Sequence, residues 1–469
     1  MKLTSIRVTK LFGIFDHTIP LNTNEHITII HGSNGLGKTT LLNMIEHFFN
    51  HNFFKLSMIP FHEFIVQFDD KSSVFLINKT VLKPNEKRKS DNNITILYKP
   101  INGKTQNYVP DLDLDEREFS YPIHMIEDIV PGISQTGPRT WRNMSTGELL
   151  NLNDILHRYS EYFPSIFSKH KNIPDWLIEI KKHNPIRFIR TERLLNREVD
   201  RRSPDKRNSE NHSVSIYANE LARDIKSRLA DYGALSQSLD RTFPARLVRL
   251  KPDDELENQM LLDKLDELEI KRKKLIELGV LDNNTDLEFR VSNEEIDDRT
   301  RSVLSIYVRD TEEKLNVFND LAARIDLLKR IIKARFRNKE MLISKENGIN
   351  FVTSAGEQLH PMSLSSGEQH QIVLLYELLF KITEDSLILI DEPELSLHVA
   401  WQVKFLRDLQ QITSVVPFDV LIATHSPQII NDRWDLTVAL QDEGDLAEEE
   451  DLTENEFDNL DRLMEGIFK

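Results

Sequence analysis

Residues 32–39 constrain the fold more than any other part of this 469-residue sequence. They read Gly-Ser-Asn-Gly-Leu-Gly-Lys-Thr, follow the β-branched run at 27–30 and precede an apolar, helix-like pattern that begins at Leu41. A Gly-rich loop between a strand and a helix lets backbone N–H groups surround a phosphate, and the helix N-terminus adds positive potential. The order therefore predicts an α/β fold with a phosphate-binding loop (P-loop) at the end of a strand.

The residues of this loop predict ATP and Mg²⁺ as ligands. Lys38 is expected to reach the β- and γ-phosphates, and the Thr39 hydroxyl to hold Mg²⁺. The full set of expected nucleotide contacts in this loop is Gly32, Ser33, Asn34, Gly35, Gly37, Lys38, Thr39 and Thr40.

A second motif consists of four apolar residues at 387–390 followed by Asp391 and Glu392. The apolar run is typical of a buried parallel strand, which would place Asp391 at its carboxyl end. There Asp391 could hold Mg²⁺, and Glu392 could polarise an attacking water molecule. An apolar strand that ends in two acids is common, so this interpretation depends on the motifs around it.

A third motif, Leu-Ser-Ser-Gly-Glu-Gln at 364–369, precedes an apolar helix-like run. It resembles the LSGGQ signature of ABC ATPases. Its serines and glycine would form a helix N-terminus directed at an anion. The expected nucleotide contacts here are Ser365, Ser366, Gly367 and Glu368.

Two further features follow the order in which motifs occur along the sequences of ABC ATPases. His425 follows an apolar strand and resembles the switch histidine that contacts the γ-phosphate, while residues 393–398 resemble the D-loop. In that family the nucleotide lies between the P-loop of one head and the signature of another, so the resemblance implies a site shared by two copies. Gln67 is a candidate metal-contacting Q-loop residue, although strand alternation explains it equally well. Phe12 and Phe15 could flank the adenine, with core packing as the alternative.

The long separation between the P-loop and the signature predicts an inserted region. Apolar heptad positions recur in two runs within 254–340, separated by Gly279 and Asn283-Asn284, which indicates a helical hairpin. A protruding coiled coil and a helical subdomain packed on itself both fit this pattern. We expect an ABC-type α/β head split by a largely helical insertion, with segments 1–130, 131–253, 254–345 and 346–469.

The amino-acid composition excludes several classes of protein and of functional site. The chain has no cysteine, which excludes disulfide frameworks, zinc hooks and cysteine catalysis. No apolar run approaches the ~18 residues of a membrane span and the N-terminus lacks a signal-peptide pattern, so we expect a cytoplasmic protein. Of the net charge of −16, residues 442–469 carry twelve acids against two bases. Residues 181–207 carry ten Lys/Arg against four Asp/Glu, either as an anion-binding surface or as ordinary solvated surface.

Four segments together resemble the OLD-like ATP-binding proteins of bacterial defence islands. They are Gly-Pro-Arg-Thr-Trp-Arg at 137–142, Arg-Phe-Ile-Arg-Thr-Glu-Arg-Leu at 187–194, and the segments 365–370 and 391–398. Among these families the chain looks most like the AriA-type ATPases of PARIS systems and next most like the PtuA-type ATPases of Septu systems.

The resemblance implies a ring-like homo-oligomer that holds a TOPRIM-type nuclease toxin and releases it when a phage protein that mimics DNA is sensed. Only 44 residues follow His425 in this sequence, which leaves no room for a TOPRIM fold, so the nuclease is expected on a separate polypeptide. The basic residues at 181–207 are the expected contact for an acidic trigger or for DNA. The alternatives are an SMC-type DNA-repair or DNA-end-binding ATPase and a stand-alone regulatory ATPase.

Overall fold

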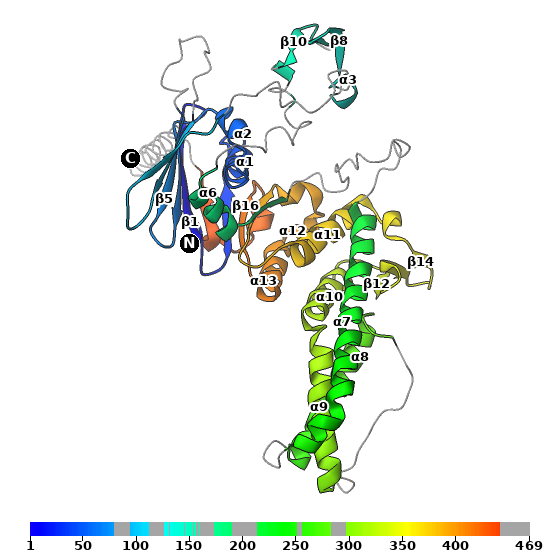
Figure 1. Ribbon diagram of the computed structural model, residues 1–469. Helices are drawn as coiled ribbons and strands as arrows, with labels where there is room; N and C mark the ends of the chain where they lie inside the picture. Colours follow the sequence, from blue (N-terminus) through cyan, green and yellow to red (C-terminus); the bar gives the residue numbers. More distant parts are fainter. Residues whose placement is uncertain are drawn as a thin grey trace, which may run out of the picture. The chain divides into compact units, whose positions relative to one another are not determined.

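The computed structural model describes residues 1–78, 94–111, 126–130, 132–144, 146–152, 154–155, 159, 173–189, 213–250, 256–282 and 297–440 (Figure 1). The chain forms two compact units and passes between them four times. The first unit comprises Met1–Arg190, Thr383–Pro393 and Phe418–Lys469, and the second comprises Thr191–Ile382 and Glu394–Pro417.

The first unit contains most of the strands. Its elements are β1 (Leu3–Leu11), β2 (Phe15–Pro20), β3 (Ile27–His31), α1 (Lys38–Phe49), α2 (Phe53–Ser57), β4 (Glu63–Phe68), β5 (Ser73–Asn78), β6 (Ile94–Lys99), β7 (Gln106–Tyr108), α3 (Ile126–Ile129), β8 (Ile133–Gly137), β9 (Thr140–Asn143), β10 (Leu149–Asn151), α6 (Asp175–His183), β11 (Ile186–Ile189), β15 (Leu387–Asp391), β16 (Asp419–Ala423), α14 (Pro427–Ile430), η11 (Trp434–Leu436) and β17 (Thr437–Ala439).

A five-stranded parallel sheet is the centre of this unit, with the order β11-β15-β16-β3-β17. Its three central strands, β15, β16 and β3, are short apolar runs buried on both faces, as is typical of parallel sheets. Helix α1 packs against β11, β15 and β16. Because the strands are parallel, the residues that follow β3, β15 and β16 lie at one edge of the sheet, where ligands of open α/β sheets bind.

A six-stranded antiparallel sheet with the order β2-β1-β4-β5-β6-β7 accompanies the parallel one. It contains the strands expected from the apolar runs near 64–66, 74–77 and 94–97. Side chains of this sheet share a core with the apolar face of α1, in which Phe48 packs edge-on against Phe49 and Phe64 at 4.9 and 6.1 Å between ring centroids. A separate small sheet, β10-β9-β8, surrounds the buried Trp141.

The second unit is mainly helical. Its elements are α7 (Ser213–Arg249), α8 (Asn258–Glu277), α9 (Asp298–Asn316), α10 (Asn319–Lys333), β12 (Lys339–Ser344), β13 (Gly348–Thr353), β14 (Gln358–Leu359), η8 (Pro361–Ser363), α11 (Ser366–Tyr376), η9 (Glu377–Lys381), η10 (Pro393–Ser396, across the unit boundary), α12 (Val399–Gln402) and α13 (Phe405–Val415).

The helices of this unit pack on one another. Helix α9 contacts both α8 and α7, and α7 also packs against β13 (Figure 1). The second of the two heptad runs expected within 254–340 is predicted as one arm of a helical hairpin. In the structure it forms two helices, because the chain turns at Val317 and Phe318 between α9 and α10. Phe318 is fully buried and its ring lies 5.5 Å from that of Tyr232 on α7, so its burial fixes the turn.

The predicted fold class is confirmed: an α/β P-loop unit accompanied by a long helical insertion. The four-segment division of the chain stays a prediction. None of the helices in the described ranges is both long and apolar enough to cross a membrane.

Candidate functional site

The P-loop connects β3 to α1 and depends on glycine at two positions. Gly32 and Gly37 have φ of 152° and 86°. A Cβ on Gly32 would lie 2.7 Å from the carbonyl oxygen of Leu440, and one on Gly37 would lie 2.7 Å from a methyl group of Leu11. Only glycine therefore lets the loop close over the end of the sheet.

The side chain of Lys38 lies within this loop. Its Nζ donates hydrogen bonds to the carbonyl oxygens of Gly32 (2.7 Å) and Ser33 (2.8 Å), and the residue is only 6% exposed. Ser33, Asn34 and Gly35 are exposed and Thr40 is half-buried. The loop thus holds a positive charge at the centre of a ring of backbone groups, an arrangement suited to phosphate.

Two oxygen ligands meet at the sheet edge. The Thr39 hydroxyl donates a hydrogen bond to Asp391 Oδ1 at 3.1 Å, joining the start of α1 to the end of β15. A hydroxyl and a carboxylate are ligands that Mg²⁺ accepts beside substrate phosphates, so the residues present fit this ion. Gln67 lies on β4 of the antiparallel sheet, where its Oε1 accepts from Ser5 Oγ at 2.7 Å. Its role as a metal contact stays a prediction, because its described partners do not include Thr39 or Asp391.

Glu392 and His425 form the third part of the arrangement. Glu392 Oε1 lies 3.8 Å from His425 Nδ1, and both side chains are partly open to solvent. Glu392 has φ of 43°, a left-handed conformation that is costly for a residue with a side chain. Its N–H donates to the carbonyl of Ala423 at 2.8 Å, which ties it to the end of β16. The fold therefore holds a strained acid beside the two Mg²⁺-type ligands.

A cavity of about 380 Å³ lies on the His425 side of the P-loop. It is lined by His31, Gly32, Ser33, Asn34, His425, Pro427, Ile430 and Trp434. Burial, together with the positive charge of Lys38, lowers the pKa of His31, and its ring meets that of Trp434 edge-on at 5.4 Å. The sequence patterns do not point to His31 or Trp434; the only signal for His31 is its place at the end of the strand before Gly32.

The two aromatic candidates near the adenine differ in their surroundings. Phe12 is 43% exposed and borders the P-loop, since a Cβ on Gly37 would lie 3.3 Å from its ring. Phe15 is half-buried and its ring stacks on that of His17 at 5.7 Å. Phe12 is thus the one with a face available to a ligand.

The signature residues belong to the second unit, at the start of α11. Ser365 and Glu368 form a capping box: Ser365 Oγ accepts from the Glu368 N–H at 3.4 Å, and Glu368 Oε2 accepts from the Ser365 N–H at 2.9 Å. Lys339 Nζ contacts both oxygens of Glu368 at 2.7 and 2.8 Å. Burial raises the pKa of Glu368, but Lys339 and the hydrogen bonds from Ser365 outweigh it and the net pKa is lowered. Ser366 is exposed and Gly367 is half-buried.

The basic stretch at 181–207 is described only in part. Lys181 and Lys182 are exposed in the last turn of α6, and Arg187 lies on β11. Positions 190–207 lie outside the described residues. The expected anion-binding surface stays a prediction.

The first unit thus brings together Lys38, Thr39, Asp391, Glu392 and His425 on the loops that follow three neighbouring parallel strands. This fold and this set of residues define a P-loop ATPase. A family model described as an AAA ATPase domain (AAA_15) matches residues 1–430, and the chain belongs to that family.

Comparison with curated proteins found no significant match. Among solved structures, the chain is similar to the Smc head domain with an extended coiled coil, bound to the C-terminal domain of ScpA and derived from Pyrococcus furiosus. The identity is 12%, the TM-score 0.33 and the coverage 94% of each chain. A second similar structure is an Smc head bound to the C-winged helix domain of ScpA, with 10% identity, a TM-score of 0.32, and coverage of 92% of this chain and 91% of that one. Since these TM-scores are low, the assignment depends on the family match and on the site.

Proposed function

We propose that the chain hydrolyses ATP at composite sites, each formed by the P-loop of one copy and the signature of a second copy. The observation that carries this proposal is the division of the motifs. The first unit gathers Lys38, Thr39, Asp391, Glu392 and His425, whereas the capped N-terminus of α11 belongs to the second unit. The motif order resembles that of ABC ATPases, in which these parts meet across two heads.

Each residue then has a role that its surroundings support. The P-loop backbone and Lys38 bind the phosphates, and Thr39 and Asp391 hold Mg²⁺, which neutralises phosphate charge when bound. Glu392 polarises the attacking water, and His425, 3.8 Å from it, contacts the terminal phosphate. The N-terminus of α11 with Ser365, Ser366 and Gly367 approaches the same nucleotide from the second copy.

The D-loop supplies an apolar surface for this pairing. Leu395 within the D-loop and Val399 directly after it are 65% and 57% exposed. Single exposed apolar side chains are ordinary on a protein surface, so their proposed role depends on the resemblance of this segment to the D-loop. We expect them to be buried when two copies pair around ATP.

The native mass of Glu392→Gln with and without ATP tests the pairing. A variant that binds ATP without rapid hydrolysis should accumulate with its heads paired, so its native mass should rise only when ATP is present. Lys38→Ala is the matched control, since it should stay at the lower mass in both conditions. If the native mass of Glu392→Gln were the same with and without ATP, the composite site would be contradicted.

For the biological role, we propose a sensor and scaffold of a bacterial anti-phage system of the AriA type. In this role the ATPase assembles as a homo-oligomeric ring and holds a separate TOPRIM-type nuclease. Support comes from the four segments that resemble OLD-like defence ATPases, two of which contain the site residues Ser365, Asp391 and Glu392.

Co-expression with the flanking open reading frames tests this role. Retention of a smaller polypeptide by a multimer of dimers supports the scaffold. A simple ATP-dependent dimer without a bound neighbour would contradict it and favour a DNA-repair or DNA-end-binding ATPase.

The trigger-sensing part of the proposal concerns the basic stretch at 181–207. Reversing the charge at Arg201, Arg202, Lys206 and Arg207 should weaken the response to an acidic phage protein, because the attraction depends on local positive charge. ATP binding should not change, since these residues are separate from the P-loop in sequence. Release of the nuclease on addition of the trigger is the measurement, and an unchanged response would refute this contact.

A further inference from the structure

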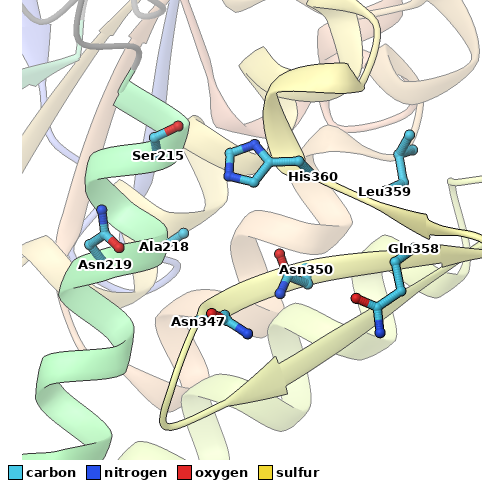
Figure 2. Close-up of a pocket in the computed structure, with 8 residues that line it drawn as sticks. All are labelled: Ser215, Ala218, Asn219, Asn347, Asn350, Gln358, Leu359 and His360. Carbon is cyan, nitrogen blue, oxygen red and sulfur yellow. The ribbon is translucent and has the colours of Figure 1, made fainter.

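A second cavity of about 380 Å³ lies entirely within the second unit, and none of its lining residues belongs to a motif of the ATPase (Figure 2). Its volume is within the ~300–1,000 Å³ range of small-molecule sites. It is lined by Ser215, Ala218, Asn219, Asn347, Asn350, Gln358, Leu359 and His360.

Two packed elements form the walls of this amide-lined cavity. Ser215, Ala218 and Asn219 share one face of α7, since they are separated by three and four positions. The opposite wall is the three-stranded sheet β12-β13-β14 with the residue that follows it, His360 (Figure 2). The start of β13 sits directly on α7, because a Cβ on Gly348 (φ 63°) would overlap the carbonyl of Ala218. Close packing therefore fixes the width of the cavity.

The lining offers hydrogen-bonding groups without charge. None of the eight lining residues is Asp, Glu, Lys or Arg. Four are carboxamides, at Asn219, Asn347, Asn350 and Gln358, and none of these side chains hydrogen-bonds to another residue in the described part of the chain. Ser215 Oγ is shielded from solvent and also has no partner among the described residues. Each carboxamide presents a donor and an acceptor side by side.

We propose that this cavity binds an uncharged ligand with a nucleobase edge, that is, a nucleoside. Asn and Gln carboxamides form paired hydrogen bonds with the donor and acceptor edge of a base. The imidazole of His360 points into the space between α7 and the sheet and offers a flat face for stacking (Figure 2). The absence of a cationic lining residue disfavours phosphorylated ligands, which separates this site from the P-loop.

The cavity is directly connected to the signature. His360 Nδ1 accepts a hydrogen bond from the Met362 N–H at 3.3 Å and so caps the short helix η8, which leads to Ser365. Gln369 Nε2 of α11 donates to the carbonyls of Met362 (3.0 Å) and Leu364 (2.9 Å). A ligand held by Gln358 and His360 therefore acts on the segment that positions the signature helix. We infer that it alters the ATPase rate, and this regulatory part rests on the proposed function.

Calorimetric titration of the full chain tests the site itself. The probes are adenosine, guanosine, cytidine and uridine, with ribose as the control for sugar binding. We expect at least one nucleoside to bind and the double variant Asn219→Ala/Gln358→Ala to bind it roughly 5- to 150-fold more weakly, since two hydrogen-bonding side chains are lost. Both residues are exposed, so the fold should survive. Gln237→Ala, about five turns further along the same face of α7, is the matched control and should bind like wild type.

Three outcomes would overturn the site: no nucleoside binds, ribose binds equally well, or the double variant retains wild-type affinity, as it would if the probe entered the P-loop. Asn219→Asp provides a second check, because it keeps the shape and removes the donor. Turnover with and without the bound nucleoside then tests regulation. A chain without ATPase activity would refute the proposed function but would leave the nucleoside-binding result intact. A normal ATPase rate that does not change when the nucleoside is bound would refute only the coupling between the cavity and the ATPase.

Discussion

At the scale of single residues, the backbone of Glu392 explains how a surface acid can be held ready for catalysis. Its left-handed φ and its hydrogen bond to Ala423 direct the chain away from β15 immediately after Asp391. Strain of this kind persists where the surrounding structure enforces it, and here the neighbouring strands do so. The pair Asp391-Glu392 therefore places two carboxylates in different positions although they are adjacent in sequence.

Glu392→Gln should slow ATP hydrolysis by roughly 10²- to 10⁴-fold, because the amide cannot act as a base. ATP binding should persist, since the phosphate contacts come from the P-loop. Turnover and the ATP-dependent rise in melting temperature are the two measurements. The exposed Glu384→Gln of the same unit should behave as wild type. If Glu392→Gln hydrolysed ATP at the wild-type rate, the assignment of Glu392 as the catalytic base would be wrong.

His31 predicts a pH dependence of stability. Burial and Lys38 lower its pKa in the folded state, so the unfolded chain binds more protons near pH 6. The stability contribution of neutral His31 is thus complete above the unfolded pKa of about 6.5 and is lost as pH falls through that value and the lower folded pKa. His31→Asn should reduce the loss of unfolding free energy between pH 7.5 and 5.5, measured with urea. If the wild type and His31→Asn lost equal amounts of unfolding free energy over this pH range, the lowered pKa of His31 would be contradicted.

At the scale of elements, the signature helix depends on its cap. Ser365→Ala removes the hydroxyl that accepts from the Glu368 N–H and should cost about 1 kcal/mol of unfolding free energy. Ser365→Thr keeps a hydroxyl cap and serves as the control. Urea unfolding measures both variants. A loss of equal size in the threonine variant would mean that the cap is not the cause.

A buried ion pair joins the segment after α10 to α13. Arg335, whose side chain is 2% exposed, contacts Asp408, and burial lowers the pKa of Arg335 to about 10. Asp408→Ala would leave a buried charge alone and should cost about 3–5 kcal/mol, whereas Arg335→Met/Asp408→Leu should be much closer to wild type. The solvent-accessible pair of Lys345 and Asp282 is the comparison, where Asp282→Ala should change the unfolding free energy far less than Asp408→Ala. Chemical denaturation decides between these values.

The elements predicted well from sequence are those that carry motifs. The P-loop strand, the strand before Asp391 and the strand before His425 are short apolar runs with a sharp end, and the structure has all three. Helix α7 was harder to predict as a partner of α9, because its buried residues are confined to Ser213–Ile225 and the rest shows no continuous apolar seam. The amide-lined cavity has no sequence signal, since its residues come from α7 and from strands more than a hundred positions later.

At the scale of the whole molecule, the composite site predicts complementation between two inactive chains. Lys38→Ala removes the P-loop function and keeps the signature, whereas Gly367→Asp adds a negative side chain at the signature and keeps the P-loop. An equal mixture should recover at most about a quarter of wild-type turnover, because half of the random dimers carry one intact site out of two. ATPase assays of the mixture and of each chain alone provide the comparison. A mixture as inactive as its parts would argue against shared sites.

The strand order of the parallel sheet also determines how late in translation β3 can pair with its neighbouring strands. Strand β3, which leads into the P-loop, pairs only with β16 and β17, so its partners begin about 390 residues later, at Asp419 and Thr437. At a ribosomal rate of ~5–20 residues per second, β3 emerges roughly 20–80 s before either neighbour exists. During that interval both edges of an apolar strand lack their native partners. We therefore expect the nascent chain to need shielding while the second unit is synthesised, and the P-loop to become functional only near the end of translation.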